Sequence, residues 1–222
     1  MKILAIDTTR EFGSLALAES GRLIEEVLLH SPDGFSPILF DRVRRLLDAH
    51  DCAVDRIDCF AAASGPGSFT GVRVGLAAIK GLAEALNKPA VAVSNLKALA
   101  TFGTAPVRAV VLDARRGEIY GAVYGSDLKV LDPEMVSKFP AWLERLPEGV
   151  LEFIALDFTP YRGTLAGTRF AQAPVIEAPR AQAAAIAKIA WQRLTANQAQ
   201  DPAALDANYV RRSDAELFWK DQ

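Results

Sequence analysis

The sequence predicts an α/β fold made of two similar halves, and two observations support this. Residues 59–63 form an apolar strand, followed by a glycine-rich loop, a helix over 72–86 and a strand over 90–93. That order is typical of a parallel crossover unit. An apolar strand also ends at Asp7 and another ends at Asp113, each before a hairpin pattern. Two copies of one pattern indicate an internal duplication.

In the first half, three strands with short turns between them predict an antiparallel meander over 2–6, 14–18 and 23–29. Ser36-Pro37 marks a helix start, with proline at the first helical position. Ser94 is expected to cap a short helix that runs to Leu99. The inward face of the helix after Pro37 is expected to carry Leu39, Phe40, Val43, Leu46 and Leu47.

The second half repeats the strand pattern and ends in an alanine-rich helix. The segment Gly103-Thr104-Ala105-Pro106 is the best boundary, which gives domains over 1–104 and 105–222. The second, smaller domain is expected to include the C-terminal helix and the tail. Its predicted strands cover 109–112, 119–124, 128–131 and 150–156, and its predicted helix covers about 181–196.

Composition restricts the class of protein. The chain has 222 residues, 50% of them hydrophobic, and a formal net charge of −2. No apolar run approaches the roughly 20 residues of a membrane span, and the two cysteines, Cys52 and Cys59, make no disulfide framework. We expect a soluble cytoplasmic protein, and a chain that by itself is no strong nucleic-acid binder.

The glycine-rich loop allows two interpretations. It departs from a Walker A loop because Gly71 is followed by Val72 and Arg73 rather than by lysine and serine or threonine. The helix N-terminus could still attract an anion through its free amides, but tight packing or assembly is the favoured explanation of the glycines. Candidate anion or nucleotide contacts are Asp7, Thr8, Thr9, Gly67, Ser68 and Asp113.

Other catalytic chemistry has weaker support. His30 and His50 do not form a paired metal-ligand spacing, and no Gly-x-Ser-x-Gly elbow is present, so no metal site and no serine nucleophile are expected. The carboxylates placed at strand ends are Asp7, Asp113 and Glu118. They suit magnesium or catalysis at the edge of the sheet, and turn capping explains them as well.

The helix over 72–86 is apolar around most of its circumference. One face carries Val72, Leu76, Ile79 and Ala83, and a second face carries mostly small residues. Such a helix needs cover on both sides. Its own sheet supplies one cover, and the other comes from the same chain or from a partner subunit.

Two runs, Ile3-Leu4-Ala5-Ile6-Asp7-Thr8-Thr9 and Gly65-Pro66-Gly67-Ser68-Phe69-Thr70-Gly71, resemble the bacterial TsaB (YeaZ) family. Val93-Ser94-Asn95-Leu96, the run from Asp113 to Tyr120, and Tyr209-Val210-Arg211 extend the resemblance over nearly the whole chain. Ala207-Asn208 departs from the family, which usually has a proline near the tail tyrosine.

The resemblance implies an actin-like, sugar-kinase-like (ASKHA) fold with two ribonuclease-H-like halves. It also implies a non-catalytic role in making threonylcarbamoyladenosine next to the anticodon of tRNA. The expected partner is the transferase TsaD, with the ATPase TsaE joining the complex, a homodimer when TsaD is absent, and tRNA contacted through the complex at most. No tightly bound cofactor is expected. Whether ATP or ADP binds at the interface of the complex is left open.

In that family the first two helices form the dimer surface. The resemblance therefore implies a partner interface made of Leu39, Phe40, Val43, Leu47, Phe69, Val72, Leu76, Ile79 and Ala83. The alternative function is a stand-alone magnesium-dependent ATPase or phosphotransferase that uses Asp7 and Asp113.

Overall fold

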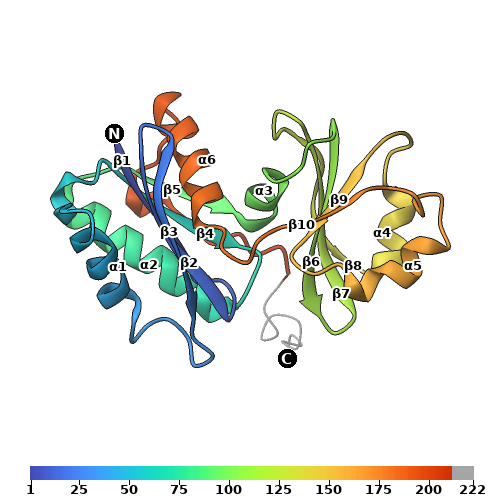
Figure 1. Cartoon of the computed structure of the whole chain (residues 1–222), viewed down its shortest axis with the longest axis horizontal. Coiled ribbons are helices and arrows are strands. Elements are labelled where there is room, and N and C mark those ends of the chain that lie inside the picture. The colour runs from blue at the N-terminus through green and yellow to red at the C-terminus, as the bar shows by residue number, and fades with distance from the viewer. Residues whose placement is uncertain (212–222) are drawn as a thin grey trace, which may run out of the picture. The chain divides into compact units, whose positions relative to one another are not determined.

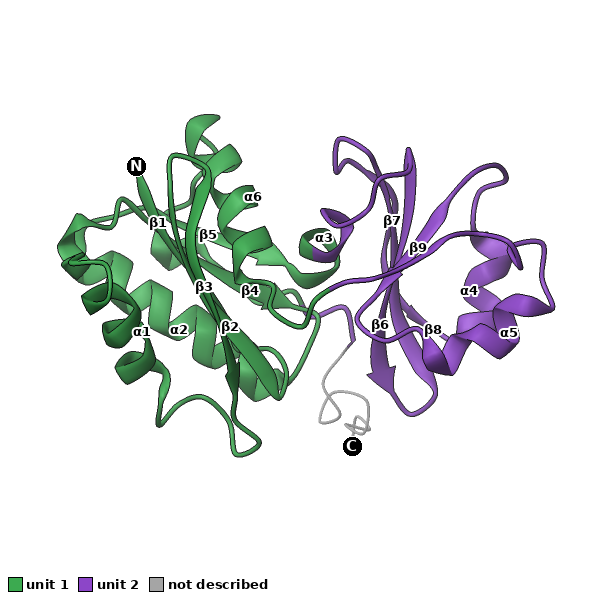
Figure 2. Ribbon diagram, in the orientation of Figure 1, with its two compact units in different colours: residues 1–98, 179–208 green, residues 99–178, 209–222 purple. Residues whose placement is uncertain are grey.

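The computed structural model describes residues 1–211, which form two compact units (Figures 1 and 2). Unit 1 contains Met1–Ala98 and Pro179–Asn208, and unit 2 contains Leu99–Ala178 and the chain from Tyr209. No helix in the described part of the chain is long and apolar enough to cross a membrane. Arg212, the end of the predicted tail, lies outside the described residues.

Unit 1 contains a five-stranded sheet in the order β3-β2-β1-β4-β5. The first three strands are antiparallel and the last two run parallel to β1, as the meander and crossover patterns predict. The strands are β1 (Lys2–Asp7), β2 (Phe12–Glu19), β3 (Arg22–His30), β4 (Cys59–Gly65) and β5 (Ala90–Ser94).

Helices cover both faces of this sheet (Figure 1). Leucine, isoleucine and phenylalanine side chains of one face pack against α1 (Leu39–Asp48) and α2 (Phe69–Leu86). The other face presents mainly alanine and valine and packs against α6 (Ala183–Thr195). The alternation of side chains along each strand separates these two sets. The remaining elements are α3 (Asn95–Ala100), which Ser94 caps as predicted, and the short helices η1 (Val54–Arg56) and η3 (Pro202–Ala204).

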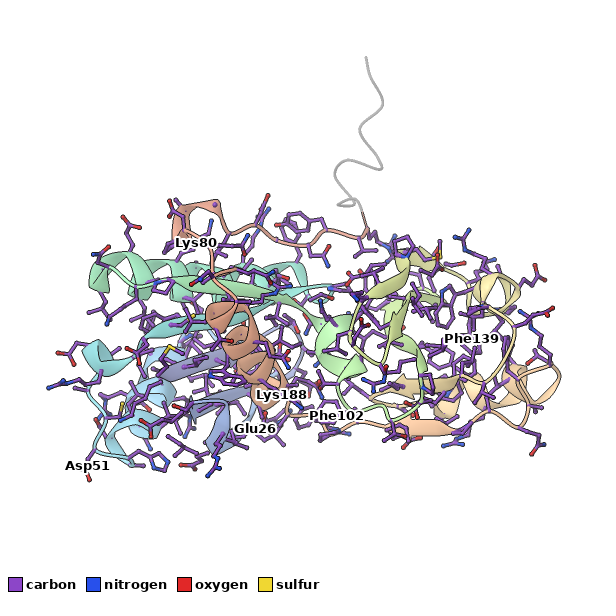
Figure 3. The ribbon with its side chains drawn as sticks, turned by 90° about the horizontal axis from the view of Figure 1, so that it is seen from above. Glu26, Asp51, Lys80, Phe102, Phe139 and Lys188 are labelled. Carbon is purple, nitrogen blue, oxygen red and sulfur yellow. The ribbon has the colours of Figure 1, made fainter. Side chains whose placement is uncertain are left out.

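The position of α6 corrects the predicted domain division. The C-terminal helix belongs to unit 1 and not to the second half. Ser14 Oγ accepts hydrogen bonds from the backbone nitrogens of Gln182 and Ala183, both at 2.9 Å. Glu26 Oε1 accepts a third from Ala184 N at 2.7 Å, and Figure 3 shows Glu26 beside the start of this helix. Side chains of β2 and β3 thus cap a helix that lies far away in the sequence.

The first helix also differs from the prediction. It begins at Leu39 rather than at Pro37, because Phe35 O accepts hydrogen bonds from Ile38 N and Leu39 N in a turn that precedes the helix. Phe40, which we expected to point inward, has 58% of its surface exposed. The other four predicted inward residues are buried.

Unit 2 repeats the plan of unit 1. Its five-stranded sheet has the order β10-β9-β6-β7-β8, which is the order of unit 1 when both sheets are followed from the third strand of the meander. The predicted duplication is therefore confirmed in the topology. The strands are β6 (Val107–Arg115), β7 (Glu118–Gly125), β8 (Val130–Ser137), β9 (Glu152–Ala155) and β10 (Val175–Glu177).

Aromatic side chains form the core of unit 2, and Phe139, labelled in Figure 3, contacts several of them. Phe139 meets Phe158 edge to face at 5.8 Å between ring centroids, and Phe153 meets Phe170 in the same way at 5.8 Å. Such geometry stabilises aromatic pairs beyond their buried area. The helices over this face are α4 (Phe139–Arg145), η2 (Thr159–Tyr161) and α5 (Arg162–Ala166).

Alkaline conditions should destabilise this fold. Burial raises the pKa of the Cys59 thiol from about 9 to about 12, and burial with nearby Asp113 and Asp157 raises the pKa of Tyr161 from 10 to about 12. The unfolded chain releases these protons at lower pH than the native protein does, so the free energy of unfolding falls as pH rises from about 9 to about 12.

Urea unfolding at pH 7, 9, 10 and 11, followed by tryptophan fluorescence under reducing conditions, measures this loss. Cys59→Ala removes one of the two titrating groups and should flatten the decline. If the free energy of unfolding falls equally steeply with pH in the variant and the original protein, Cys59 does not contribute to the loss of stability.

Candidate functional site

Asp7, at the carboxyl end of β1, is fully buried and bound by donors of its own chain. Its Oδ1 accepts hydrogen bonds from Thr9 N at 2.9 Å and Thr9 Oγ1 at 2.6 Å. Its Oδ2 accepts one from Arg10 Nη2 at 3.2 Å. A carboxylate satisfied in this way stabilises the turn that follows the strand. The geometry favours this structural role of Asp7 over magnesium binding.

Asn95, which the sequence interpretation noted only as part of the family resemblance, connects three elements at this point. Its Nδ2 donates to Thr9 Oγ1 at 2.8 Å, and its Oδ1 accepts from Gly65 N at 3.0 Å. The side chain is buried and joins the ends of β1 and β4 to the start of α3. The only local sign that Asn95 connects these elements was its position as a polar residue directly after Ser94, the predicted helix cap.

The glycine-rich loop packs against the Thr8-Thr9 turn. A Cβ atom on Gly67 would lie 2.7 Å from Thr9 O, and one on Gly71 would lie 2.1 Å from Thr8 O. Only glycine allows the two backbones to approach this closely. The loop is therefore shaped by a contact between β1 and α2 within unit 1.

Groups of the chain itself also satisfy donors at the N-terminus of α2. Ser68 N donates to Thr9 O at 2.7 Å, and Gly71 N donates to Ser68 Oγ at 3.3 Å. Thr8 Oγ1 donates to Gly71 O at 2.7 Å. Of the two interpretations of the loop, the geometry supports close packing, and the candidate anion contacts Thr8 and Thr9 are buried within it.

The candidate carboxylates of the second half lie in unit 2. Asp113 is exposed, and its Oδ1 accepts a hydrogen bond from Arg115 N at 2.7 Å. Glu118 forms an ion pair with Arg211. These contacts hold the β6–β7 hairpin and the tail, which agrees with the turn-capping interpretation.

Most of the residues predicted to form the partner interface are buried. Seven of its nine residues are buried in the core of unit 1: Leu39, Val43, Leu47, Val72, Leu76, Ile79 and Ala83. Their side chains pack within unit 1, and of the seven only Leu39 also lines the groove described next. Phe40 and Phe69 are exposed, with 58% and 46% of their surface accessible.

These two phenylalanines line a groove of about 490 Å³ between α1 and α2. On the α2 side it is also lined by Thr70, Arg73, Val74, Ala77 and Ala78, and on the α1 side by Ser36 and Leu39. The Arg73 guanidinium carbon lies 3.6 Å from the centroid of the Phe69 ring, which is a cation–π contact. The surface we call the α1–α2 groove is defined by Phe40, Phe69, Arg73, Val74 and Ala77.

The histidines and cysteines form no shared centre. His30 pairs with Glu11 at 2.7 Å and His50 with Glu25 at 2.6 Å, while both cysteines are free and buried. Within residues 1–211, no three histidine, cysteine, aspartate or glutamate side chains are grouped so that they could hold a metal ion.

Two sheets of the same order define the class of this protein as the actin-like (ASKHA) fold. Solved structures of this class superpose on 89% and 88% of the chain with TM-scores of 0.53 and 0.56. Their identity to this chain is 9%, so the likeness shows the fold alone.

Sequence comparison is more specific. Residues 33–211 match the family model described as "TsaD: tRNA N6-adenosine threonylcarbamoyltransferase". "tRNA threonylcarbamoyladenosine biosynthesis protein TsaB" of Bacillus subtilis (strain 168) is 35% identical over 153 residues, which cover 67% of each chain. The protein of the same name from Escherichia coli (strain K12) is 36% identical over 57% of this chain and 56% of its own length. The structure "YeaZ from Pseudomonas aeruginosa" is 26% identical, with a TM-score of 0.76 over 94% of this chain and 99% of that one.

The chain therefore belongs to the TsaB (YeaZ) family and is a homologue of proteins of tRNA threonylcarbamoyladenosine biosynthesis.

Adding one methyl group to the loop tests the packing interpretation. Gly71→Ala should destabilise unit 1 by at least about 2 kcal/mol, because the new Cβ overlaps the Thr8 carbonyl. Gly81→Ala is the matched control, since that glycine lies in the same helix with no atom within 4 Å of its Cβ position. The control should gain about 0.5–1 kcal/mol. Thermal and urea unfolding measure both, and equal effects would contradict the packing argument.

Proposed function

We propose that this chain is a non-catalytic assembly subunit of tRNA threonylcarbamoyladenosine modification, which binds and activates a TsaD-type threonylcarbamoyltransferase. The observation that carries the proposal is the α1–α2 groove, where one phenylalanine of each helix, Phe40 and Phe69, stays exposed. Membership of the TsaB family supplies the reaction to which this surface would contribute.

The chemistry of the groove suits a helix from a partner protein. Aromatic and arginine side chains contribute most of the binding energy at protein interfaces, and Phe40, Phe69 and Arg73 gather such groups on one surface. Apolar grooves between helices commonly receive the apolar face of another helix. The open side of α2 would then be covered by a partner subunit, while its buried side is covered by its own sheet.

The polar network at the end of β1 agrees with a non-catalytic role. Both carboxylate oxygens of Asp7 accept hydrogen bonds from donors of the same chain, and Ser68 N donates to Thr9 O. In this proposal the TsaD-type partner carries out the group transfer. This chain binds no cofactor tightly, and ATP or ADP binds at the interface of the complex. TsaE would join that complex, and a homodimer would use the same groove in the absence of TsaD.

The double variant Phe40→Ser and Phe69→Ser tests the groove directly. Because both side chains are exposed, the fold should persist, while affinity for TsaD should fall at least about 30-fold, the loss expected when an interface loses about 2 kcal/mol. Isothermal titration calorimetry with purified TsaD measures this loss. Charged replacements of Leu76 or Ile79 would be uninformative, since both are core residues.

Leu131→Ser, a change at a leucine of unit 2 with 57% of its surface exposed, is the matched control and should bind as the original chain does. Unchanged affinity of the double variant would reject the groove as the interface. The function itself is tested by threonylcarbamoyl transfer to tRNA with TsaD and the other pathway proteins, with and without this chain. Equal transfer in both reactions would reject the proposed function.

A further inference from the structure

The two sheets have four edge strands, and three of these edges are protected. β10 has only three residues, and β8 carries Pro133 and two register shifts against β7. At β5, Ala90 exchanges two backbone hydrogen bonds with Gln200, and Arg193 Nη1 donates to Ala92 O at 2.7 Å. Short strands, prolines, irregular pairing and covering segments are the means by which proteins keep sheet edges from pairing with other chains.

The fourth edge, β3, is long and open. It has nine residues without proline or glycine, and after one bulge at Ile24 the segment from Glu25 to His30 keeps a regular antiparallel register with β2. Within residues 1–211, the backbone of this segment hydrogen-bonds to β2 alone. Leu23, Ile24 and Leu28 of the strand have 39% to 51% of their surface exposed. An edge of this kind is a ready template for another strand.

The alternation of the ladder identifies the backbone groups of β3 that face away from β2. Ser31 N donates to Glu11 O at 3.1 Å, so these two residues form one of the hydrogen-bonded pairs of the ladder. Every second residue repeats that position, so the odd-numbered residues of the segment direct their backbone groups toward β2. The N–H and C=O groups of Glu26, Leu28 and His30 therefore point outward, and their side chains share one face of the strand.

We propose that β3 pairs with β3 of a second copy of this chain, antiparallel and centred on Leu28. In this register Leu28 faces Leu28 of the second copy, and Glu26 faces His30 of the second copy. On the opposite face of the strand, Val27 faces Leu29. Each pair joins two apolar side chains or a carboxyl group and an imidazole, which are favourable cross-strand combinations. The outward backbone groups of both strands then gain partners in one continuous sheet.

Neighbouring registers combine the side chains less well. A centre at Glu26 would set the two Glu26 carboxyl groups opposite each other, and like charges across strands are destabilising. A centre at Val27 would place each Glu26 against the apolar side chain of Leu28. A centre at Leu29 would set Glu26 opposite Pro32, which has no N–H to donate. The sequence of the strand is therefore most complementary to itself when Leu28 lies on the two-fold axis.

The expected contact is small and weak. A stable interface commonly buries about 1,600 Å² in total, and a single short strand pair buries less, so we expect a dissociation constant of about 10 to 100 µM. None of the described residues that line the α1–α2 groove belongs to β3. The inference therefore does not depend on the proposed function, and a chain whose groove is occupied by TsaD can pair through β3 in the same way.

The test uses the residue that faces itself. All samples carry Phe40→Ser and Phe69→Ser, so that association through the groove is removed, and sedimentation velocity at about 5 to 200 µM measures what remains. Leu28→Lys and Leu28→Glu should each weaken self-association at least about tenfold, because like charges then meet at the centre of the pair. An equimolar mixture of the two variants should restore association to within about threefold, since opposite charges face each other in the mixed pair.

Leu23→Lys is the matched control. This leucine lies in the same strand with 51% of its surface exposed, but it precedes the bulge and lies outside the pairing. The control should associate as the parent does, and the Leu28 variants should fold as the control does, because 49% of Leu28 is exposed. A parent that stays monomeric at all concentrations would overturn the inference. Equal association of the Leu28 variants and the control would also overturn it, as would a mixture that restores nothing.

Titration of TsaD into Leu28→Lys with the groove intact separates self-pairing from a contact with the transferase. Binding equal to that of the original chain is expected. If the original chain binds TsaD and this variant does not, the β3 edge belongs to the interface with TsaD, and self-pairing is overturned. If the original chain does not bind TsaD, the proposed function fails, and the sedimentation measurements still decide the inference.

Discussion

The close approach of the Thr8-Thr9 turn to the start of α2 is the contact on which the rest of unit 1 depends. Gly67 and Gly71 allow the two backbones to meet, and Ser68 N closes the gap by donating to Thr9 O. Asn95 then joins the same turn to the end of β4 and the start of α3. Because these bonds fix the start of α2 relative to the sheet, they also fix the helix face that carries Phe69 and Arg73.

The two units share a strand order but differ in what occupies equivalent positions. In unit 1 the end of the first strand is buried, and its aspartate is enclosed by hydrogen bonds. In unit 2 the corresponding strand ends in an exposed hairpin, where Asp113 Oδ1 accepts a hydrogen bond from Arg115 N. The end of the first strand thus serves packing beneath helices in unit 1 and forms an exposed turn in unit 2. Such divergence is the expected result when a duplicated fold keeps its core and varies its loops.

The strands, the duplication and the core of α2 could be predicted because each follows from local periodicity. Predictions that depended on distant partners were wrong. Nothing near the C-terminal helix indicates that Ser14 and Glu26 cap it, so sequence proximity placed the helix in the second half. Phe40 was expected inside because it adjoins a buried stripe, yet it lines the groove with Phe69. Asn95 was missed because its partners, Thr9 in the turn after β1 and Gly65 at the end of β4, are distant in sequence.

The return of α6 to the first sheet has a consequence for synthesis on the ribosome. Unit 1 consists of Met1–Ala98 and Pro179–Asn208, so the segment between them is made before the sheet receives its second helical layer. During that interval the alanine- and valine-rich face of the sheet is exposed to water and to other nascent chains. Unit 2 has its own core and completes most of its sequence earlier. The order in which the units mature is therefore the reverse of the order in which their first residues emerge.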